Sequence, residues 1–435
     1  MIQGDCMNRQ ILDLIIVGAG PAGLMAAKTA AEWGLSVVVI EKNKDFSKLL
    51  RACSAQFIMD AGYEREAMEI RKHKLVFPKN HFEVPYDGDL VPIKNKYYHS
   101  PQNHIIHFAR CNGEAFAFKF DKRKLLADLY EVCKDVGVGF RMGTLATAGV
   151  DYGDEVSVQV RGENGDEVLK CKKLIIAEGV NAHLSGSMGL NENRMHYATA
   201  YTVKYFLEGV KDIEPYSWNL YYGKCYHTNS PAIIGPSLHG NHIVEMTLTG
   251  DARLKPAQIF EGLRADSPLS EQLKDVKVIS KIGCPVKAFS SLKTPYKGNV
   301  LAIGDTAAFV EVEVQGALMC GLHAAHSIVR EIKGEPGFED YTKWWNDSFE
   351  FNSSDYLRVS QGYALVPTYT DDELDYLFGL IENKRLEGTY SQYKTPELIW
   401  GAILEHKEKI KEEAPEIYHK MSNMDQSSLA DSFSK

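Results

Sequence analysis

The fold of this chain is decided by one stretch near its start, which reads Ile-Leu-Asp-Leu-Ile-Ile-Val over residues 11–17, Gly-Ala-Gly-Pro-Ala-Gly over 18–23 and Gly-Leu-Ser-Val-Val-Val-Ile-Glu over 34–41. Two apolar runs flank a glycine turn and an alanine-rich segment, which is the pattern of a strand–helix–strand unit. Gly18 permits a tight turn, Gly20 lets a pyrophosphate approach the backbone, and Gly23 allows the helix to pack closely on the strand. The stretch therefore predicts a dinucleotide-binding site.

The ends of this unit supply the polar groups that such a ligand needs. A helix that begins near Pro21 and Ala22 directs N–H groups and the positive end of its dipole toward the pyrophosphate. Glu41 lies 23 residues after Gly18, where a carboxylate at the end of the second strand accepts hydrogen bonds from an adenosine ribose. Because a free acid there disfavours a 2′-phosphate, we expect FAD or NAD rather than NADP, with Lys42 as a further contact.

The bulk properties exclude several classes of protein. The 435 residues can build two or three cores, and 44% hydrophobic and 25% charged residues are ordinary for a globular protein. A net charge of -9 without a lysine/arginine block argues against nucleic-acid binding. No apolar run approaches the roughly 18 residues of a membrane span, and residues 1–10 lack the apolar core of a signal peptide. We therefore expect a cytoplasmic protein.

The eight cysteines are scattered, and no Cys-x-x-Cys pair occurs. This distribution argues against a zinc site, an iron–sulfur site and a dithiol redox pair, so no metal is expected. In a cytosolic chain most of these thiols are expected to be buried.

Beyond the glycine stretch, the first half of the chain alternates between helical and β-like patterns. Residues 63–73 are charged and helical in character, whereas short β-like runs and turns fill 74–107. Asp121 is expected to cap a helix over 122–136. Asn164-Gly165 lies between two apolar runs and predicts a hairpin, after which 174–177 reads as a separate buried strand.

The second half changes from a β-rich to a helical texture. Residues 197–290 are mainly β-like, with one predicted helix near 256–264. A buried strand at 299–303 precedes a long helix over 316–333, and most of 338–421 is helical in pattern. No second Gly-x-Gly-x-x-Gly occurs. If the electron donor is a nicotinamide cofactor, it would therefore have to reach the flavin without a binding domain of its own.

Four segments carry a resemblance to a known family. They are the glycine stretch ending at Glu41, Arg51-Ala52-Cys53, the run Leu174-Ile-Ile-Ala-Glu178-Gly179, and Gly304-Asp305-Thr-Ala-Ala. Read together in this order, they resemble the FAD-dependent oxidoreductases built like p-hydroxybenzoate hydroxylase, and within them the geranylgeranyl reductase family. The resemblance covers residues 11 to about 330 and implies FAD as the cofactor. The chain is a divergent member, since Glu178 stands where the family has Asp.

The resemblance also implies roles for individual residues. Asp305 would hold the ribityl chain of the flavin, and the helix start at Gln315, Gly316 and Ala317 would face the pyrimidine end. Cys53 matches the cysteine that sits by the isoalloxazine ring, where a thiol would donate a proton or shape the substrate pocket. Tyr222 is a second candidate for the acid.

The implied fold is α/β, a Rossmann-like FAD-binding domain with an inserted β-rich substrate domain and a helical C-terminal region. We predict that the FAD-binding domain comprises 8–75, 105–190 and 291–333. The β-rich domain would comprise 76–104 and 191–290, and the helical region 334–421. Residues 422–435 are predicted to be a disordered tail, because the last dozen are rich in Ser and Asp.

The leading functional hypothesis is an FAD-dependent reductase or dehydrogenase that acts on a carbon–carbon bond of an apolar or unsaturated substrate. Flavin N5 would give or take a hydride at one carbon, and a nearby acid would handle the proton at the other. The electron donor would be NAD(P)H, ferredoxin or another flavoprotein, and peripheral contact with a membrane is a further expectation. Two alternatives stay open: a flavin monooxygenase that hydroxylates a small aromatic, and a flavin-binding partner protein without turnover.

Overall fold

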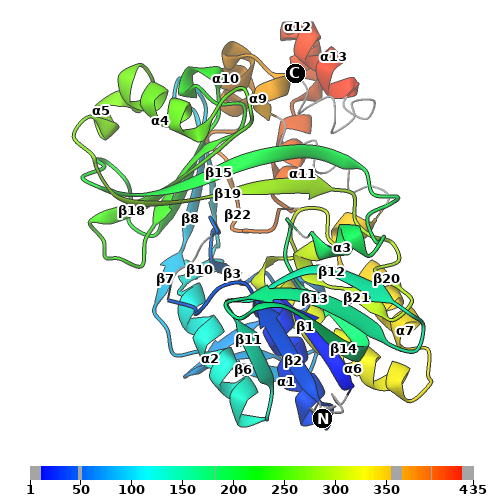
Figure 1. The fold of residues 1–435 in the computed structure, drawn as a ribbon. Coiled ribbons are helices and arrows are strands. Elements are labelled where there is room, and N and C mark those ends of the chain that lie inside the picture. The colour runs from blue at the N-terminus through cyan, green and yellow to red at the C-terminus, as the bar shows by residue number, and fades with distance from the viewer. Residues whose placement is uncertain (1–10, 48–50, 182, 354–364, 393, 424–435) are drawn as a thin grey trace, which may run out of the picture. The chain divides into compact units, whose positions relative to one another are not determined.

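The computed structural model describes residues 11–47, 51–181, 183–353, 365–392 and 394–423. The chain separates into two compact units, whose elements are labelled in Figure 1. Unit 1 comprises Met1–Ser47, Leu126–Arg194 and Ser291–Asp347, and unit 2 comprises Lys48–Leu125, Met195–Ser290 and Ser348–Lys435. Each unit therefore combines three separate stretches of sequence.

Unit 1 is built on an eight-stranded sheet that contains the glycine stretch. β1 (Leu12–Val17) pairs in parallel with β2 (Val37–Glu41) on one side and with β14 (Gly165–Ile176) on the other. β11 (Gly139–Met142) continues the parallel part beside β2, and β21 (Val300–Ala302) pairs in parallel with the end of β14. The other strands of this sheet are β12 (Leu145–Asp151), β13 (Val156–Gly162) and β20 (Tyr296–Lys297).

β14 is one long strand where the sequence predicted a hairpin arm and a separate buried strand. Its first half pairs antiparallel with β13, with Gly162 opposite Gly165, which confirms the predicted hairpin. Its second half pairs in parallel with β1. The prediction of two strands was wrong because Lys172 and Lys173 interrupt the apolar pattern but not the extended backbone. Their ammonium groups form ion pairs with Asp13 and Glu331.

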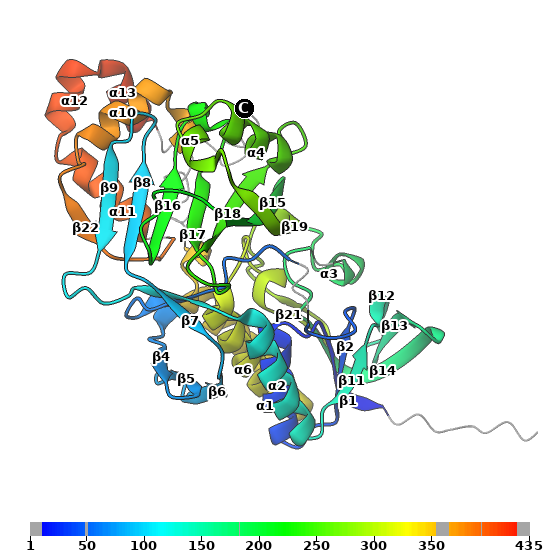
Figure 2. The same ribbon diagram turned by 90° about the vertical axis from the view of Figure 1, so that its left-hand side faces the viewer.

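Two helices of unit 1 pack tightly against each other. They are α1 (Pro21–Glu32) and α6 (Glu313–Ile332), which lie side by side in Figure 2. A Cβ atom on Gly321 of α6 would lie only 2.4 Å from the carbonyl oxygen of Ala22, so this close approach requires a glycine. Unit 1 also contains α3 (Leu184–Ser187), η3 (Gly304–Thr306), most of α7 (Gly337–Ser348) and most of α2 (Lys122–Asp135).

Unit 2 contains a second eight-stranded sheet and two three-stranded sheets. In order across the large sheet, the strands are β19 (Lys277–Phe289), β15 (His196–Glu208), β18 (Ile243–Gly250), β17 (Ala232–Pro236), β16 (Ser217–Tyr221), β8 (Asn95–His99), β9 (Ile105–Ala109) and β22 (Arg385–Glu387). The small sheets are β3 (Gln56–Ile58), β10 (Ala117–Phe120) and β7 (Leu90–Ile93), and β4 (Glu69–Arg71), β5 (Lys74–Phe77) and β6 (Phe82–Pro85).

The large sheet of unit 2 has hydrophobic clusters on both faces. Trp218 and Leu220 of β16 belong to one cluster, whereas Tyr221 belongs to the other, as the alternation of side chains along a strand requires. The helices α4 (Pro256–Ala265) and α5 (Ser270–Leu273) cover the Tyr221 side. The Trp218 side is covered by α9 (Leu365–Thr368), α10 (Asp371–Gly379), α11 (Lys394–Leu404), α12 (Lys407–Glu413) and α13 (Pro415–Ser422).

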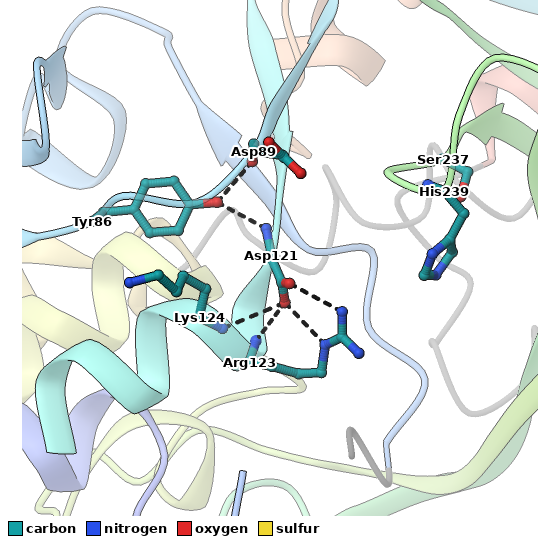
Figure 3. A network of polar contacts seen from close by, with 7 residues as sticks. All are labelled: Tyr86, Asp89, Asp121, Arg123, Lys124, Ser237 and His239. Carbon is teal, nitrogen blue, oxygen red and sulfur yellow. Dashed lines mark hydrogen bonds and ion pairs between the residues drawn. The ribbon is translucent and has the colours of Figure 1, made fainter. Parts of the chain in front are cut away.

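The helix α2 (Lys122–Asp135) begins as the sequence predicted. The carboxylate of Asp121 accepts hydrogen bonds from the backbone N–H groups of Arg123, at 2.9 Å, and Lys124, at 3.4 Å (Figure 3). The backbone N–H of Asp121 donates to the hydroxyl of Tyr86, which in turn donates to the carbonyl oxygen of Asp89. These contacts confirm Asp121 as the helix cap.

Other predictions had different outcomes. The expected helix over 63–73 was wrong, because this segment forms the short 3₁₀ turn η1 (Tyr63–Arg65) and then β4. Glu64 and Arg65 take positive φ values of 47° and 58°, which a regular helix cannot contain. The predicted domain boundaries stay a prediction. The predicted disordered tail lies almost wholly outside the described residues.

Candidate functional site

The predicted cofactor residues of unit 1 gather where its parallel strands end. Gly18 follows β1, Glu41 ends β2, Glu178 and Gly179 follow β14, and Gly304 and Asp305 follow β21. These four strands are parallel neighbours in one sheet, so their carboxyl ends meet at one edge. This edge is where open α/β sheets bind ligands.

Each glycine of the fingerprint meets a distinct requirement. Gly18 has a φ of +106°, and a Cβ atom there would lie 2.3 Å from the carbonyl oxygen of Ala177. A Cβ atom on Gly23 would lie 1.9 Å from the carbonyl oxygen of Gly18, so the helix could not approach the turn. By contrast, a Cβ atom on Gly20 would meet nothing within 4 Å. The space beside Gly20 therefore fits a group that approaches the backbone from outside.

The start of α1 adds hydrogen-bond donors at this position. Pro21 is the first helical residue, and both it and Ala22 are buried. The N–H groups of Ala22 and Gly23 lie in the first turn, where no helical carbonyl precedes them. A helix start of this kind favours an anion such as a pyrophosphate.

Glu41 is held in place by backbone groups and fits a ribose. Its side chain is buried, and one oxygen, Oε2, accepts a hydrogen bond of 2.8 Å from the N–H of Ala19. The other oxygen, Oε1, accepts from the N–H and the side-chain amide of Asn43. A carboxylate has about four lone-pair sites, so Oε2 retains one for a ribose hydroxyl. Burial raises the pKa of Glu178, and the charge of Lys42, the exposed residue that follows Glu41, partly offsets that rise.

Glu178 and Gly179 form the second loop of the site. Burial raises the pKa of Glu178, while its hydrogen bond from the N–H of Leu184, at 2.9 Å, acts in the opposite direction. The N–H of Gly179 donates to the hydroxyl of Thr306 at 3.0 Å. Thr306 lies in the loop after β21, so the loops that follow β14 and β21 are joined directly.

The loop after β21 is strained and firmly held. Val310 has a φ of +119°, an unusual value for a β-branched residue, which costs on the order of 1–3 kcal/mol. Arg194 compensates by donating to the carbonyl oxygens of Thr306, at 2.8 Å, and Ala308, at 2.7 Å. Asp305 accepts a hydrogen bond of 2.9 Å from the N–H of Val312. The loop is therefore fixed in one conformation beside the start of α6.

The remaining predicted cofactor residues of unit 1 lie in the first turn of α6. Gln315, Gly316 and Ala317 are all buried there. Because this helix begins directly after the Asp305 loop, its N-terminal N–H groups lie at the same carboxyl edge of the sheet.

The predicted residues Arg51, Ala52, Cys53 and Tyr222 belong to unit 2. Cys53 is half-buried, and the ammonium group of Lys122 lies 3.7 Å from its Sγ atom. The carbonyl oxygen of Ala52 accepts a hydrogen bond from the thiol of Cys284, with 3.8 Å between the oxygen and Sγ. Arg51 is half-buried at the start of this segment.

Tyr222 lies in the hydrophobic core of unit 2. It is 1% exposed and packs against the rings of Tyr98, at a centroid distance of 4.9 Å, and Phe378, at 6.1 Å. Its N–H donates to the carbonyl oxygen of His99. The proposed catalytic use of Tyr222 stays a prediction.

Sequence reasoning missed several polar residues around these sites. Arg194 has no sequence signal that marks it, and Thr306 lies within the Gly304-Asp305-Thr-Ala-Ala segment but was given no role there. Lys119 and Lys204 are different, because each stands inside an apolar strand and is less than 5% exposed. A lysine enclosed by aromatic and aliphatic residues in a strand was the signal that could have identified them.

None of the helices in the ranges given above is long and apolar enough to cross a membrane. The same ranges contain no group of three or more His, Cys, Asp or Glu side chains that could hold a metal ion.

Comparisons with known proteins identify the cofactor. The FAD binding domain family matches residues 12–312. The digeranylgeranylglycerophospholipid reductase of Methanosarcina acetivorans is 22% identical over 335 residues, which are 76% of each chain. The enzyme of the same name from Methanocaldococcus jannaschii is 23% identical over 377 residues, 84% of this chain and 90% of that one.

Solved structures share the fold over almost the whole chain. A geranylgeranyl bacteriochlorophyll reductase-like protein from Thermoplasma acidophilum superposes with a TM-score of 0.73 at 18% identity, covering 95% of this chain and 99% of that one. The p-nitrophenol 4-monooxygenase of Pseudomonas putida superposes with a TM-score of 0.62 at 14% identity, covering 91% and 98%. These likenesses confirm the predicted α/β fold.

The glycine cradle, the ribose-accepting Glu41 and the helix start of α1 fit the adenosine diphosphate half of FAD. This fit agrees with the family match and with the reductase relatives, and it confirms FAD rather than NAD as the cofactor. The chain belongs to the FAD binding domain family and is an FAD-dependent oxidoreductase, a divergent relative of the geranylgeranyl reductases.

Proposed function

We propose that this enzyme reduces a carbon–carbon double bond of a largely apolar substrate. The sequence relatives are named as reductases of a geranylgeranyl lipid, and a geranylgeranyl chain is an apolar hydrocarbon with isolated double bonds. When bound, FAD supplies a hydride from N5. The chain must then bind the cofactor, exclude water and provide a proton for the second carbon.

The residues proposed to hold FAD lie at the carboxyl edge of the unit 1 sheet. Gly18, Gly20, Gly23 and the start of α1 would bind the pyrophosphate, and Glu41 the adenosine ribose. The second group in unit 1 comprises Lys42, Glu178, Gly179, Gly304, Asp305, Gln315, Gly316 and Ala317. Arg51 and Ala52, which belong to unit 2, are predicted to bind the cofactor on the family resemblance alone. Asp305 would bind a hydroxyl of the ribityl chain, because its loop is held rigidly by Arg194 and Val312.

Cys53 is the proposed proton donor, and its ammonium neighbour is the observation that carries this proposal. Hydride addition to one carbon of a double bond leaves the other carbon needing a proton. The thiol of Cys53 would give that proton, the π bond would be lost, and a thiolate would remain on the protein. Lys122, 3.7 Å from Sγ, would stabilise this thiolate and return a proton from solvent.

The other reaction partners follow from this chemistry. FAD must be reduced again after each turnover, so the enzyme needs an external electron donor: NAD(P)H, ferredoxin or another flavoprotein. A lipid substrate would bring the protein into peripheral contact with a membrane. Hydroxylation of an aromatic substrate is favoured less, because the monooxygenase neighbour shares only the fold, at 14% identity.

The test is reoxidation of the reduced holoprotein without oxygen. Dithionite-reduced protein is mixed with geranylgeraniol, and the flavin absorbance near 450 nm is followed. We expect the oxidised spectrum to return with geranylgeraniol but not with phytanol, its saturated counterpart. Absence of reoxidation by any unsaturated isoprenoid, in protein that holds FAD, would refute the proposed function.

A further inference from the structure

The turn that carries Cys53 is anchored through four successive carbonyl groups in unit 2. The carbonyl oxygen of Ala52 accepts from the Cys284 thiol at 3.8 Å, and that of Cys53 accepts from the ammonium group of Lys204. The carbonyl oxygen of Ser54 accepts from Lys119 at 2.8 Å. The carbonyl oxygen of Ala55 accepts from the N–H of Phe120 at 3.0 Å.

The two lysines share one buried carboxylate. Glu245 Oε2 lies 2.5 Å from the Nζ atoms of both Lys119 and Lys204, and all three side chains are at most 6% exposed. Lys119 lies on β10, in the three-stranded sheet that also contains β3. Lys204 and Glu245 lie on β15 and β18 of the large sheet, so the three residues link the two sheets. We call Lys119, Lys204 and Glu245 the buried triad.

Burying the three charged groups of the triad lowers the stability of the fold, so stability by itself does not explain them. Removing two ammonium groups and a carboxylate from water carries a penalty that their attraction repays only with good geometry and further hydrogen bonds. Here the triad holds one more positive than negative group, and carbonyl oxygens of Cys53 and Ser54 supply the extra acceptors. Apolar side chains at these three strand positions would pack in the core without this desolvation penalty. What the charged side chains provide beyond packing is the pair of hydrogen bonds to the carbonyl oxygens of Cys53 and Ser54.

We propose that Lys119, Lys204 and Glu245 are positioning residues that hold the Cys53 turn in the orientation required for proton donation. This inference rests on the proposed function only for the role of Cys53, because the anchoring can be measured without turnover. The strain at Ala55, whose φ is +50°, agrees with a turn that is held by its surroundings rather than by its own preference. Each anchor binds a carbonyl, so it fixes the backbone and leaves the thiol accessible.

The test compares the holoenzyme with a variant in which the triad is replaced as a unit. Lys119→Met, Lys204→Met and Glu245→Leu together remove every charge, so no charged group is left buried without its partner and the fold is expected to persist, while the carbonyl oxygens of Cys53 and Ser54 lose these donors. The matched control is Lys281→Met, an exposed lysine of β19. Two readouts need no activity: the alkylation rate of Cys53 by iodoacetamide, mapped by peptide, and amide hydrogen exchange over residues 52–55.

We expect amide exchange in this turn to accelerate about tenfold or more and the alkylation rate of Cys53 to change, while Cys133 and Cys171 stay protected. A second variant, Lys204→Arg, keeps a donor for the Cys53 carbonyl and should preserve both values. In alkene reduction the triple variant should lose roughly tenfold or more in kcat with little change in KM, because misplacement of a reacting group slows the chemical step.

Unchanged exchange and alkylation in a folded triple variant would overturn the inference. Loss of protection at Cys133 and Cys171 as well would also overturn it, because the triad would then stabilise the whole protein rather than the turn. Faster exchange at 52–55 supports the anchoring even if Cys53→Ala reduces alkenes normally. Normal alkene reduction by Cys53→Ala would refute the proposed role of Cys53 as proton donor and leave the anchoring of the turn intact.

Discussion

The hydroxyl oxygen of Thr306 lies 3.0 Å from the amide nitrogen of Gly179. This contact joins the loops that follow β21 and β14, both of which carry residues proposed to bind FAD. Thr306 is 2% exposed, so water cannot replace the hydrogen bond when the hydroxyl is removed. One buried side chain therefore links the two loops directly.

We expect Thr306→Val to weaken FAD binding by roughly fivefold to tenfold, since a buried hydrogen bond contributes about 1 kcal/mol. The dissociation constant is measured by quenching of flavin fluorescence on titration of the apoprotein. Thr342→Val on α7 is the control, because that hydroxyl donates only to its own helix, at the carbonyl of Phe338. Equal FAD affinity in the two variants would contradict the role of Thr306.

Loss of Arg194 is expected to have a larger effect on FAD binding by the same loop. Burial lowers the pKa of its guanidinium to about 10, so it stays charged at neutral pH. Arg194→Met leaves the carbonyls of Thr306 and Ala308 without their donor, and we expect purified protein to lose most of its bound FAD. Arg330→Met, at a half-buried arginine paired with Glu335, is the control and should keep full occupancy, measured as the ratio of absorbance at 450 and 280 nm. Full occupancy in Arg194→Met would show that the strained loop holds without its clamp.

Glu41 tests the adenosine half of the site. Glu41→Gln keeps the shape but replaces one acceptor oxygen by a donor amide, so it loses a contact to Ala19 or Asn43 and the charge that favours a ribose hydroxyl. We expect FAD to bind about tenfold to a hundredfold more weakly, since hydrogen bonds to charged groups contribute about 1.5–3 kcal/mol. FMN, which lacks the adenosine, should compete equally well against either protein. A matching loss of affinity for FMN would contradict the assignment.

Lys122 is expected to govern turnover through Cys53. In Lys122→Met the first turnover uses the proton already on the thiol but forms a thiolate that no ammonium stabilises, and later turnovers also lack the group that reprotonates it. Single-turnover reoxidation should therefore slow, and steady-state kcat should fall further. The neighbouring exposed residue Arg123 provides the control as Arg123→Met. An equal loss in the single-turnover and steady-state rates would contradict a reprotonating role.

The pH dependence of stability has a clear sign at Lys96. This residue of β8 is 3% exposed, its Nζ donates to the hydroxyl of Thr395 at 2.7 Å, and burial lowers its pKa from 10.5 to about 7. The unfolded chain holds this proton up to higher pH than the folded chain, so stability rises with pH between about 7 and 10. The cost of the buried charge is fully present below pH 7.

Lys96→Met removes that cost, so the variant should melt at or above the wild-type temperature at pH 6 and lose this advantage as the pH approaches 10. Differential scanning calorimetry of both proteins across this range measures the difference, in which contributions from other groups cancel. Lys94→Met, at an exposed position two residues earlier, should show no such trend. A difference that does not depend on pH would mean that Lys96 is not buried as a charge.

The sequence was most informative where one physical requirement dictates the residue type. Gly18, Gly23 and Glu41 were predictable because a tight turn, a close helix and a ribose each demand a particular side chain. FAD, Asp305 and Cys53 came from resemblance to a family. The long strand β14 was misread because two lysines within it resemble a loop, although they form ion pairs at its surface.

The buried triad and Arg194 could not be predicted for a different reason. Their partners lie far away in the sequence, as with Lys119 and Glu245, and a lysine within a strand is normally taken to face solvent. Only the pairing of β10, β15 and β18 with their neighbours brings these charges together. Positioning residues of this kind depend on tertiary contacts and leave little trace in local pattern.

The central claim is tested most directly by the stoichiometry of anaerobic single turnover. A known amount of dithionite-reduced holoprotein, freed of excess reductant, is mixed with geranylgeraniol, and the dihydro product is quantified by mass spectrometry against the flavin reoxidised. We expect one double bond to be reduced for each flavin reoxidised, and none with the Cys53→Ala variant on the same timescale. Reoxidised flavin without a reduced product, or no reoxidation at all, would contradict it.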